Sequence, residues 1–302
     1  MLRTEACVRQ IKYAAPGSVE AAAAILAEHG ERARMLAGGT DLIVQIREWL
    51  RDVDVVVDAK RIPELMEISF AEDGSMTLGA ATPCHRIYAD ERVVDTYPGL
   101  IDAVSMIGGT AIQGRASVGG NLCNSGPAGD SIPPLIVYSA VCNIAGPEGR
   151  RSVAAEDFCT GPGRNVLGAG ELLVSLTFPA QAEGSGAHYL RFIPRNEMDI
   201  AVVGAGAHVQ LDGAGVIESA RVSVGAVAPV PLLVEEAGDV LVGKEANEAS
   251  YALAGAASRA AATPIDDMRG TIEYRKHMSS VLTVRALRGA VARAKGGRVN
   301  GH

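Results

Sequence analysis

Two short glycine-containing segments carry the residue types that bind a diphosphate. The first is AGGTD at residues 37–41, and the second is SVGGN at residues 117–121. Each combines two glycines, which let backbone N–H groups approach an anion, with a hydroxyl side chain that can donate to a phosphate oxygen. Two such segments together suit a diphosphate. Either one alone fits a simple tight turn about equally well, because Gly-Gly turns are common.

Other motifs offer little competing chemistry. The motif GxGxxG is absent, and GDVLVGKE at 238–245 approaches a P-loop but has Glu245 where a P-loop has a magnesium-binding Ser or Thr. A carboxylate there would repel phosphate, so we expect a strand that turns into a helix. The six histidines and five cysteines show no metal-ligand spacing, and we predict no metal site and no catalytic side chain. Cys123 is interpreted as a small buried thiol rather than a ligand contact.

Composition and charge exclude several classes of protein. The chain has 302 residues, of which 48% are hydrophobic and 21% charged, which is typical of a folded protein of about two domains. Its net charge of −7 argues against nucleic-acid binding, and no apolar run is long enough to span a membrane. The N-terminus lacks a signal-peptide pattern and the cysteines are scattered, so we expect a cytoplasmic protein.

Helices and strands alternate in the predicted first half. We expect a helix at 18–29, with Ser18 as its N-cap and Gly30 just past its end, and a second helix at 41–50. Residues 84–105 are predicted to be helical with a break at Pro98-Gly99. Strands are expected at 33–37, 53–58, 74–80, 135–145 and 171–178. Residues 107–134 are so rich in glycine and proline that we expect a long functional loop without helix or strand.

A domain boundary is predicted at QAEGSG, residues 181–186. Beyond it we expect strands near 187–193, 200–211 and 219–227, then helices near 246–262 and 272–295. This pattern indicates a first domain at 1–180, with subdomains at about 1–58 and 59–180, and a smaller second domain at 187–295.

Four motifs in the same order resemble one known family. AGGTD at 37–41 and SVGGNLCNSGPAGDSIPPL at 117–135 resemble the FAD-binding medium subunit of molybdenum hydroxylases, the family of the xanthine dehydrogenase flavin domain and the carbon monoxide dehydrogenase medium subunit. YLRFIPRNEMDIAVVGAGAHV at 189–209 and TPIDDMRGTIEYRKHMSSVLTVRAL at 263–287 resemble parts of its C-terminal domain. The resemblance implies an α+β fold, with a two-part FAD-binding domain of the vanillyl-alcohol-oxidase (PCMH) type followed by a small α/β flavoprotein domain.

The resemblance also implies which residues contact FAD. Asp130 matches a ribose-contacting acid, and Leu173 matches an apolar contact with the cofactor. Arg191 stands where many relatives carry Lys near the flavin, so we hypothesise that its charge stabilises reduced anionic flavin. Matched position by position, the full set is Met35, Leu36, Ala37, Gly38, Gly39, Thr40, Asp41, Leu42, Ile107, Ser117, Val118, Gly119, Gly120, Asn121, Asp130, Leu173 and Arg191.

By the same resemblance, this chain is an electron-transfer subunit. Substrate would be oxidised at a molybdenum cofactor on a large subunit, and electrons would pass through [2Fe–2S] clusters of a small subunit to FAD and on to an external acceptor. The expected assembly is a dimer of heterotrimers. Asn121 to Pro134 holds no cysteine-rich insertion, which disfavours the 4-hydroxybenzoyl-CoA reductase branch. The alternatives are a free-standing FAD-dependent oxidoreductase of the same fold and a non-catalytic nucleotide-binding regulator.

Overall fold

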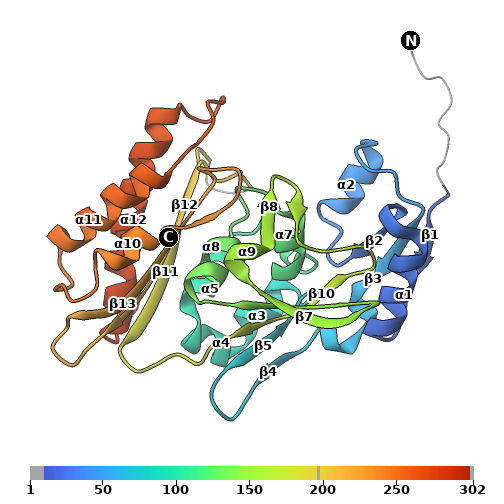
Figure 1. The fold of residues 1–302 in the computed structure, drawn as a ribbon, viewed down its shortest axis with the longest axis horizontal. Helices are drawn as coiled ribbons and strands as arrows, with labels where there is room; N and C mark the ends of the chain where they lie inside the picture. The colour runs from blue at the N-terminus through green and yellow to red at the C-terminus, as the bar shows by residue number, and fades with distance from the viewer. Residues whose placement is uncertain (1–9, 196–197, 300–302) are drawn as a thin grey trace.

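The computed structural model describes residues 10–195 and 198–299 and has the mixed helix and sheet content that was predicted (Figure 1). The chain begins with a parallel three-stranded sheet of order β1-β3-β2, formed by β1 (Lys12–Ala14), β2 (Ala33–Leu36) and β3 (Val55–Asp58). Between β1 and β2 lies helix α1 (Val19–His29). As predicted, Ser18 caps α1 by accepting a 3.2 Å hydrogen bond from the Ala21 N–H, and Gly30 follows with φ +53°.

The middle of the chain is an antiparallel five-stranded sheet of order β4-β5-β10-β6-β7. One continuous apolar core holds this sheet and its helices together, with Tyr97, Phe158 and Phe178 among its fully buried side chains. The strands are β4 (Ile68–Phe70), β5 (Met76–Gly79), β6 (Val141–Gly146), β7 (Gly149–Ala154) and β10 (Leu172–Phe178). The helices are α3 (Cys84–Ala89), α4 (Glu91–Thr96), α5 (Pro98–Val104), α6 (Thr110–Gln113), α7 (Val118–Asn124), α8 (Ile132–Val137) and α9 (Ala155–Phe158).

Shorter elements complete this part of the chain. They are two short strands, β8 (Cys159–Gly161) and β9 (Arg164–Asn165), and three 3₁₀ turns, η1 (Gly30–Arg32), η2 (Ala59–Arg61) and η3 (Pro63–Leu65).

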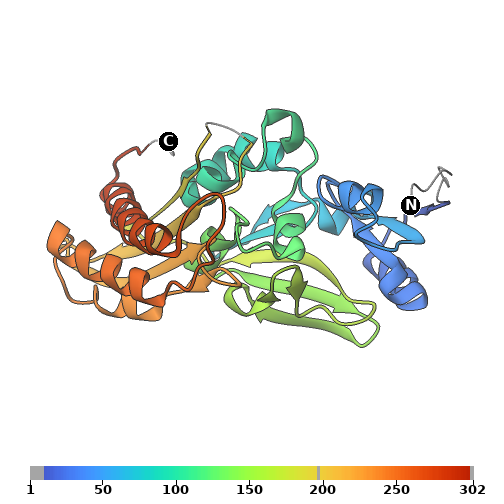
Figure 2. The same ribbon diagram turned by 90° about the horizontal axis from the view of Figure 1, so that it is seen from above.

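The C-terminal part is an antiparallel four-stranded sheet of order β11-β12-β13-β14, covered on one face by helices. The helix face holds a second apolar core, while α5 and α8 contact the strands from the other side. Figures 1 and 2 show the three larger sheets in a row, with α1 at one end and α11 at the other. The elements are β11 (Ser185–Phe192), β12 (Val203–Leu211), β13 (Ile217–Gly225), β14 (Leu232–Leu233), α10 (Glu235–Asp239), α11 (Glu248–Ala261) and α12 (Ile272–Ala294).

The expectation that residues 107–134 lack helices is wrong. The segment holds α6, α7 and the start of α8. Ser117 caps α7 by accepting a 3.1 Å hydrogen bond from the Gly120 N–H, and Pro133 lies in the first turn of α8, where the missing N–H costs nothing. Short capped helices therefore tolerate glycine and proline because tertiary packing holds them.

Three other predicted elements differ in the structure. Helix α2 (Leu42–Arg47) is shorter than the predicted 41–50, since the chain leaves helical geometry at Trp49 with φ +59°. Residues 135–137 belong to α8 rather than to a strand. The segment 238–245 begins in the last residues of α10 and continues as turns, not as a strand that leads into a helix; α10 starts earlier, with the acidic Glu235 and Glu236 in its first turn.

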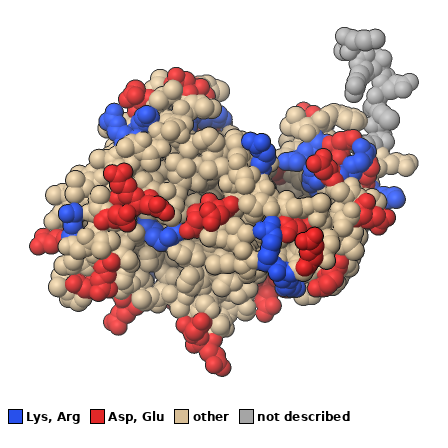
Figure 3. All heavy atoms as spheres, in the orientation of Figure 1, with Lys and Arg blue, Asp and Glu red and all other residues tan. Residues whose placement is uncertain are grey.

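No helix in the described part of the chain is both long and apolar enough to cross a bilayer. Figure 3 shows acidic and basic side chains interspersed over the visible face, without an extended basic surface.

Candidate functional site

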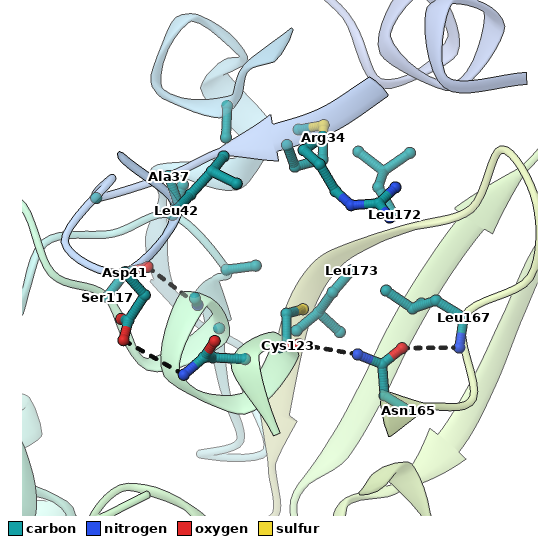
Figure 4. Close-up of a pocket in the computed structure, with 18 of the residues that line it drawn as sticks. Arg34, Ala37, Asp41, Leu42, Ser117, Cys123, Asn165, Leu167, Leu172 and Leu173 are labelled. Atoms are coloured by element: carbon teal, nitrogen blue, oxygen red, sulfur yellow. Dashed lines mark hydrogen bonds between the residues drawn. The ribbon is translucent and has the colours of Figure 1, made fainter. Parts of the chain in front are cut away.

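A cavity of about 480 Å³ lies between the N-terminal sheet and the middle sheet. Its wall brings together segments that are far apart in the sequence: the turn after β2, the start of α7, and the chain from residue 163 to Leu173 (Figure 4). Both glycine-containing segments therefore face one space, as the diphosphate interpretation requires.

The first segment presents a row of open backbone donors. The N–H groups of residues 38–41 donate to no acceptor among the described residues. Gly39 has φ +78°, a conformation that favours glycine, and a Cβ on Gly38 would lie 2.7 Å from the carbonyl oxygen of Arg115. Both glycines are thus required by the backbone path, and that path leaves successive N–H groups available for an anion.

The second segment is packed just as closely. A Cβ on Gly119 would lie 2.5 Å from the carbonyl oxygen of Ala80, so α7 rests directly on the chain that follows β5. The side chain of Asn121, in the first turns of α7, accepts a 2.8 Å hydrogen bond from the Ser131 hydroxyl. The backbone of α7 is therefore positioned by contacts on both sides.

Side chains link the two segments across the cavity wall. The Asn124 amide, at the end of α7, donates to Asp41 over 3.4 Å and accepts from the Gln45 amide over 3.2 Å. Gln45 in turn accepts a 2.6 Å hydrogen bond from Arg51. This network ties α2 to α7 and keeps the two glycine-containing segments at a constant separation.

The remaining wall is largely apolar. Ile107, Leu167, Leu172 and Leu173 line it, together with Cys123. Burial raises the pKa of the Cys123 thiol to about 12, so it is protonated at neutral pH and is not a nucleophile. A flat heterocycle fits such a wall through apolar contact.

Most of the predicted FAD contacts line this cavity. They are Met35, Ala37, Gly38, Gly39, Thr40, Asp41, Leu42, Ile107, Ser117, Gly119, Gly120, Asn121 and Leu173. Leu36 and Val118 do not line it: Leu36 lies in β2 beside Gly39, and Val118 is buried in the core. Asp130 and Arg191 also lie outside the lining and contact each other.

Asp130 and Arg191 form a buried ion pair. Arg191 approaches one carboxylate oxygen to 2.6 Å, and the Tyr189 hydroxyl donates to the other over 2.8 Å. Burial raises the pKa of Asp130, while the charge of Arg191 opposes that rise. The pair joins the α7–α8 loop to β11, and the neighbouring Ser131 contacts Asn121 of the cavity wall. The contacts of Asp130 with ribose and of Arg191 with flavin stay predictions.

The sequence analysis did not identify every wall residue. Among those it missed are Arg34, Asn165 and Leu172, and Asn124, which lies inside the 117–135 motif but was not singled out. Asn165 donates to the carbonyl of Cys123 over 2.9 Å and so holds β9 against α7. For Arg34, the sequence did offer an indication of its role, because this residue lies in the strand that leads directly into AGGTD.

The described residues include no group of histidine, cysteine and carboxylate side chains that could hold a metal ion. The open N–H groups, the close backbone approaches and the size of the cavity instead fit a dinucleotide such as FAD. The glycine-containing segments would hold its diphosphate, and bound FAD would supply electron-transfer chemistry through its isoalloxazine ring.

The fold and the cavity thus define a dinucleotide-binding protein. The family described as "FAD binding domain in molybdopterin dehydrogenase" matches residues 9–181, and the family described as "CO dehydrogenase flavoprotein C-terminal domain" matches residues 188–290. This chain belongs to the FAD-binding medium-subunit family of molybdenum-dependent dehydrogenases, and its cofactor is FAD.

Relatives of this chain are subunits of dehydrogenases. The xanthine dehydrogenase FAD-binding subunit of Escherichia coli is 33% identical over 88% of this chain and 91% of its own length. The carbon monoxide dehydrogenase medium chain of Afipia carboxidovorans is 33% identical over 94% and 97%. The structure of carbon monoxide dehydrogenase from Hydrogenophaga pseudoflava superimposes with a TM-score of 0.90 at 30% identity, covering 94% of this chain and 98% of that chain.

Proposed function

We propose that this chain is the FAD-carrying electron-transfer subunit of a molybdenum hydroxylase complex. It takes electrons from [2Fe–2S] clusters on a small subunit and passes them to an external acceptor, while substrate is oxidised at a molybdenum cofactor on a large subunit. The observation that carries the proposal is the share of each relative's length that this chain covers. This chain spans nearly the whole of relatives that are named as one subunit of a larger dehydrogenase.

The names of the relatives also support a division of labour between subunits. Chains of comparable similarity are named for xanthine, for carbon monoxide and for nicotinate, at 33%, 33% and 28% identity. The same type of flavin-binding chain thus occurs in dehydrogenases named for chemically unrelated substrates. We therefore assign substrate selection to the large subunit.

Two groups of exposed apolar side chains support assembly with other subunits, since large apolar patches on a free surface are unusual. The first group lies on α2 and just beyond it, and the second lies ahead of β12 and of α12. Their members are Ile43, Val44, Trp49 and Leu50 in the first group, and Met198, Ile200, Ile265 and Met268 in the second. We propose a dimer of heterotrimers in the cytoplasm, where the described cysteines, all unpaired, would stay reduced.

Asp130 and Arg191 are proposed to act on the flavin as one neutral pair. Arg191 alone would favour anionic reduced flavin, but the Asp130 carboxylate, at 2.6 Å, cancels most of that charge at a distance. Loss of the carboxylate would leave an uncompensated guanidinium.

Purification of the native complex through an affinity tag on this chain tests the proposal. We expect two further subunits, iron–sulfur absorbance, and flavin bands that acid releases into the supernatant. A tagged chain that purifies alone, with a flavin that stays in the acid pellet, would instead indicate a free-standing oxidoreductase. Protein that remains colourless after incubation with FAD would indicate a non-catalytic regulator.

A further inference from the structure

Arg34 is a cation in the cavity wall that none of the recognised motifs contains. It lies in β2, ahead of the first glycine-containing segment, and its guanidinium points into the cavity beside Leu172 (Figure 4). Ser117 and Asp41 lie across the cavity from it in the same view. Arg34 therefore faces a part of the cavity other than the diphosphate turns.

The guanidinium of Arg34 forms no close ion pair with a carboxylate among the described residues. Its one described hydrogen bond is a 2.9 Å donation to the carbonyl of Ala33, and the carboxylate whose charge acts on it is Glu31. Arg34 is half-buried; burial lowers its pKa, the positive charge of Arg51 lowers it further, and the negative charge of Glu31 partly opposes both. A half-buried guanidinium that donates one hydrogen bond has further donors to satisfy, and a ligand that offers acceptors or an electron-rich ring would satisfy them.

The surroundings of Arg34 distinguish the two ends of the cavity. Leu26 and Gly30, at the end of α1, and residues 168–170 close the end that holds Arg34. Ile107 precedes α6 and Cys123 lies in α7, and α7 contacts Ser131, the neighbour of Asp130, through Asn121. With the diphosphate on the two glycine-containing segments, one end takes the flavin and the other takes the adenosine.

We propose that Arg34 binds the adenosine half of FAD and thereby selects FAD over FMN. Adenine offers ring-nitrogen acceptors and a π-face, and the planar guanidinium of arginine can donate to the first and stack on the second. FMN has no adenosine and gains nothing from Arg34. The inference rests on FAD binding by this chain, and its test requires no partner subunit.

The test compares the purified full-length chain, stripped of flavin, with its Arg34→Gln and Arg34→Lys variants. Dissociation constants for FAD and FMN are measured by flavin fluorescence, and ADP is added as a competitor that carries the adenosine without the flavin. We expect Arg34→Gln to weaken FAD and ADP about tenfold and to leave FMN unchanged, and Arg34→Lys to show a smaller loss of the same pattern because lysine lacks the planar group.

Arg285→Gln serves as the matched control, because Arg285 is an exposed arginine on α12. It should leave all three constants at the values of the unmodified chain. If Arg34→Gln does not fold, the FAD-to-FMN ratio of Arg34→Lys carries the test. Equal weakening of FAD and FMN, or no change in either, would overturn the assignment.

Discussion

Gly119→Ala tests whether the close packing of α7 builds the cofactor site. A Cβ at this position would lie 2.5 Å from the carbonyl oxygen and 2.6 Å from the Cβ of Ala80. Both atoms belong to Ala80, whose backbone is held in place by the 2.9 Å hydrogen bond from its N–H to the Val174 carbonyl. Ala80 cannot move aside as the end of a flexible side chain would, so α7 must shift.

The expected change in the free energy of unfolding follows from two opposing effects. Overpacking of this kind costs about 1–3 kcal/mol. Alanine in place of glycine within a helix returns up to about 1 kcal/mol. We expect the apo chain to lose about 1–2 kcal/mol of unfolding free energy. A shift of α7 also moves the Gly120 and Asn121 backbone in the cavity wall, so FAD affinity should fall about tenfold, equivalent to about 1.4 kcal/mol.

Urea unfolding of the apo chain and FAD titration by fluorescence quenching measure the two quantities. Gly114→Ala is the matched control, since Gly114 has φ −66° and a Cβ there would meet no atom within 4 Å. We expect Gly114→Ala to change the free energy of unfolding by less than about 0.5 kcal/mol. If Gly119→Ala matches the control in both assays, the packing argument is refuted. If it is destabilised but binds FAD normally, α7 does not form part of the cofactor site.

Three further perturbations have defined outcomes. Ser117→Ala removes the acceptor of the Gly120 N–H and should cost about 1 kcal/mol in urea unfolding together with weaker FAD binding, whereas an unchanged midpoint would contradict the capping role. Burial lowers the pKa of His208 from 6.5 to about 4, so the unfolded chain binds a proton between these values and the folded chain does not. Stability should therefore fall by about 3 kcal/mol as pH drops from 6.5 to 4, and His208→Gln should flatten that dependence; equal slopes would exclude His208 as the cause. Asp130→Asn should raise the flavin midpoint potential, because it leaves the charge of Arg191 uncompensated. Arg191→Met should change the potential little, because the unpaired Asp130 would become protonated. Both potentials are measured by spectroelectrochemical titration, and a large drop for Arg191→Met would contradict the neutral-pair proposal.

The sequence predicted those features that depend on neighbouring residues. Ser18 and Gly30 mark the two ends of α1 because a capping hydroxyl and a left-handed glycine act within one helical turn. The strands β11, β12 and β13 and the helices α11 and α12 follow hydrophobic patterning in the same way. The two glycine-containing segments were recognisable because the backbone paths they allow are local properties of glycine. The domain boundary at 181–186 stays a prediction, as does the full list of FAD contacts.

Local rules failed where packing overrides them. Residues 107–134 were predicted to be a loop on composition, yet α7 forms because Ala80 and Ser131 hold it from both sides. Helix α2 was predicted to extend to residue 50 but ends at Arg47.

What the sequence by itself determined is the family, the α+β content and the two glycine-containing turns. Only the tertiary structure decided that both turns face one cavity, that Arg34 points into it, and that Asp130 pairs with Arg191 across 61 residues of chain. The physical reason is the separation along the chain of the residues that interact. Caps, turns and periodicity depend on atoms a few residues apart, whereas a cavity wall and a buried ion pair depend on which distant segments share a core.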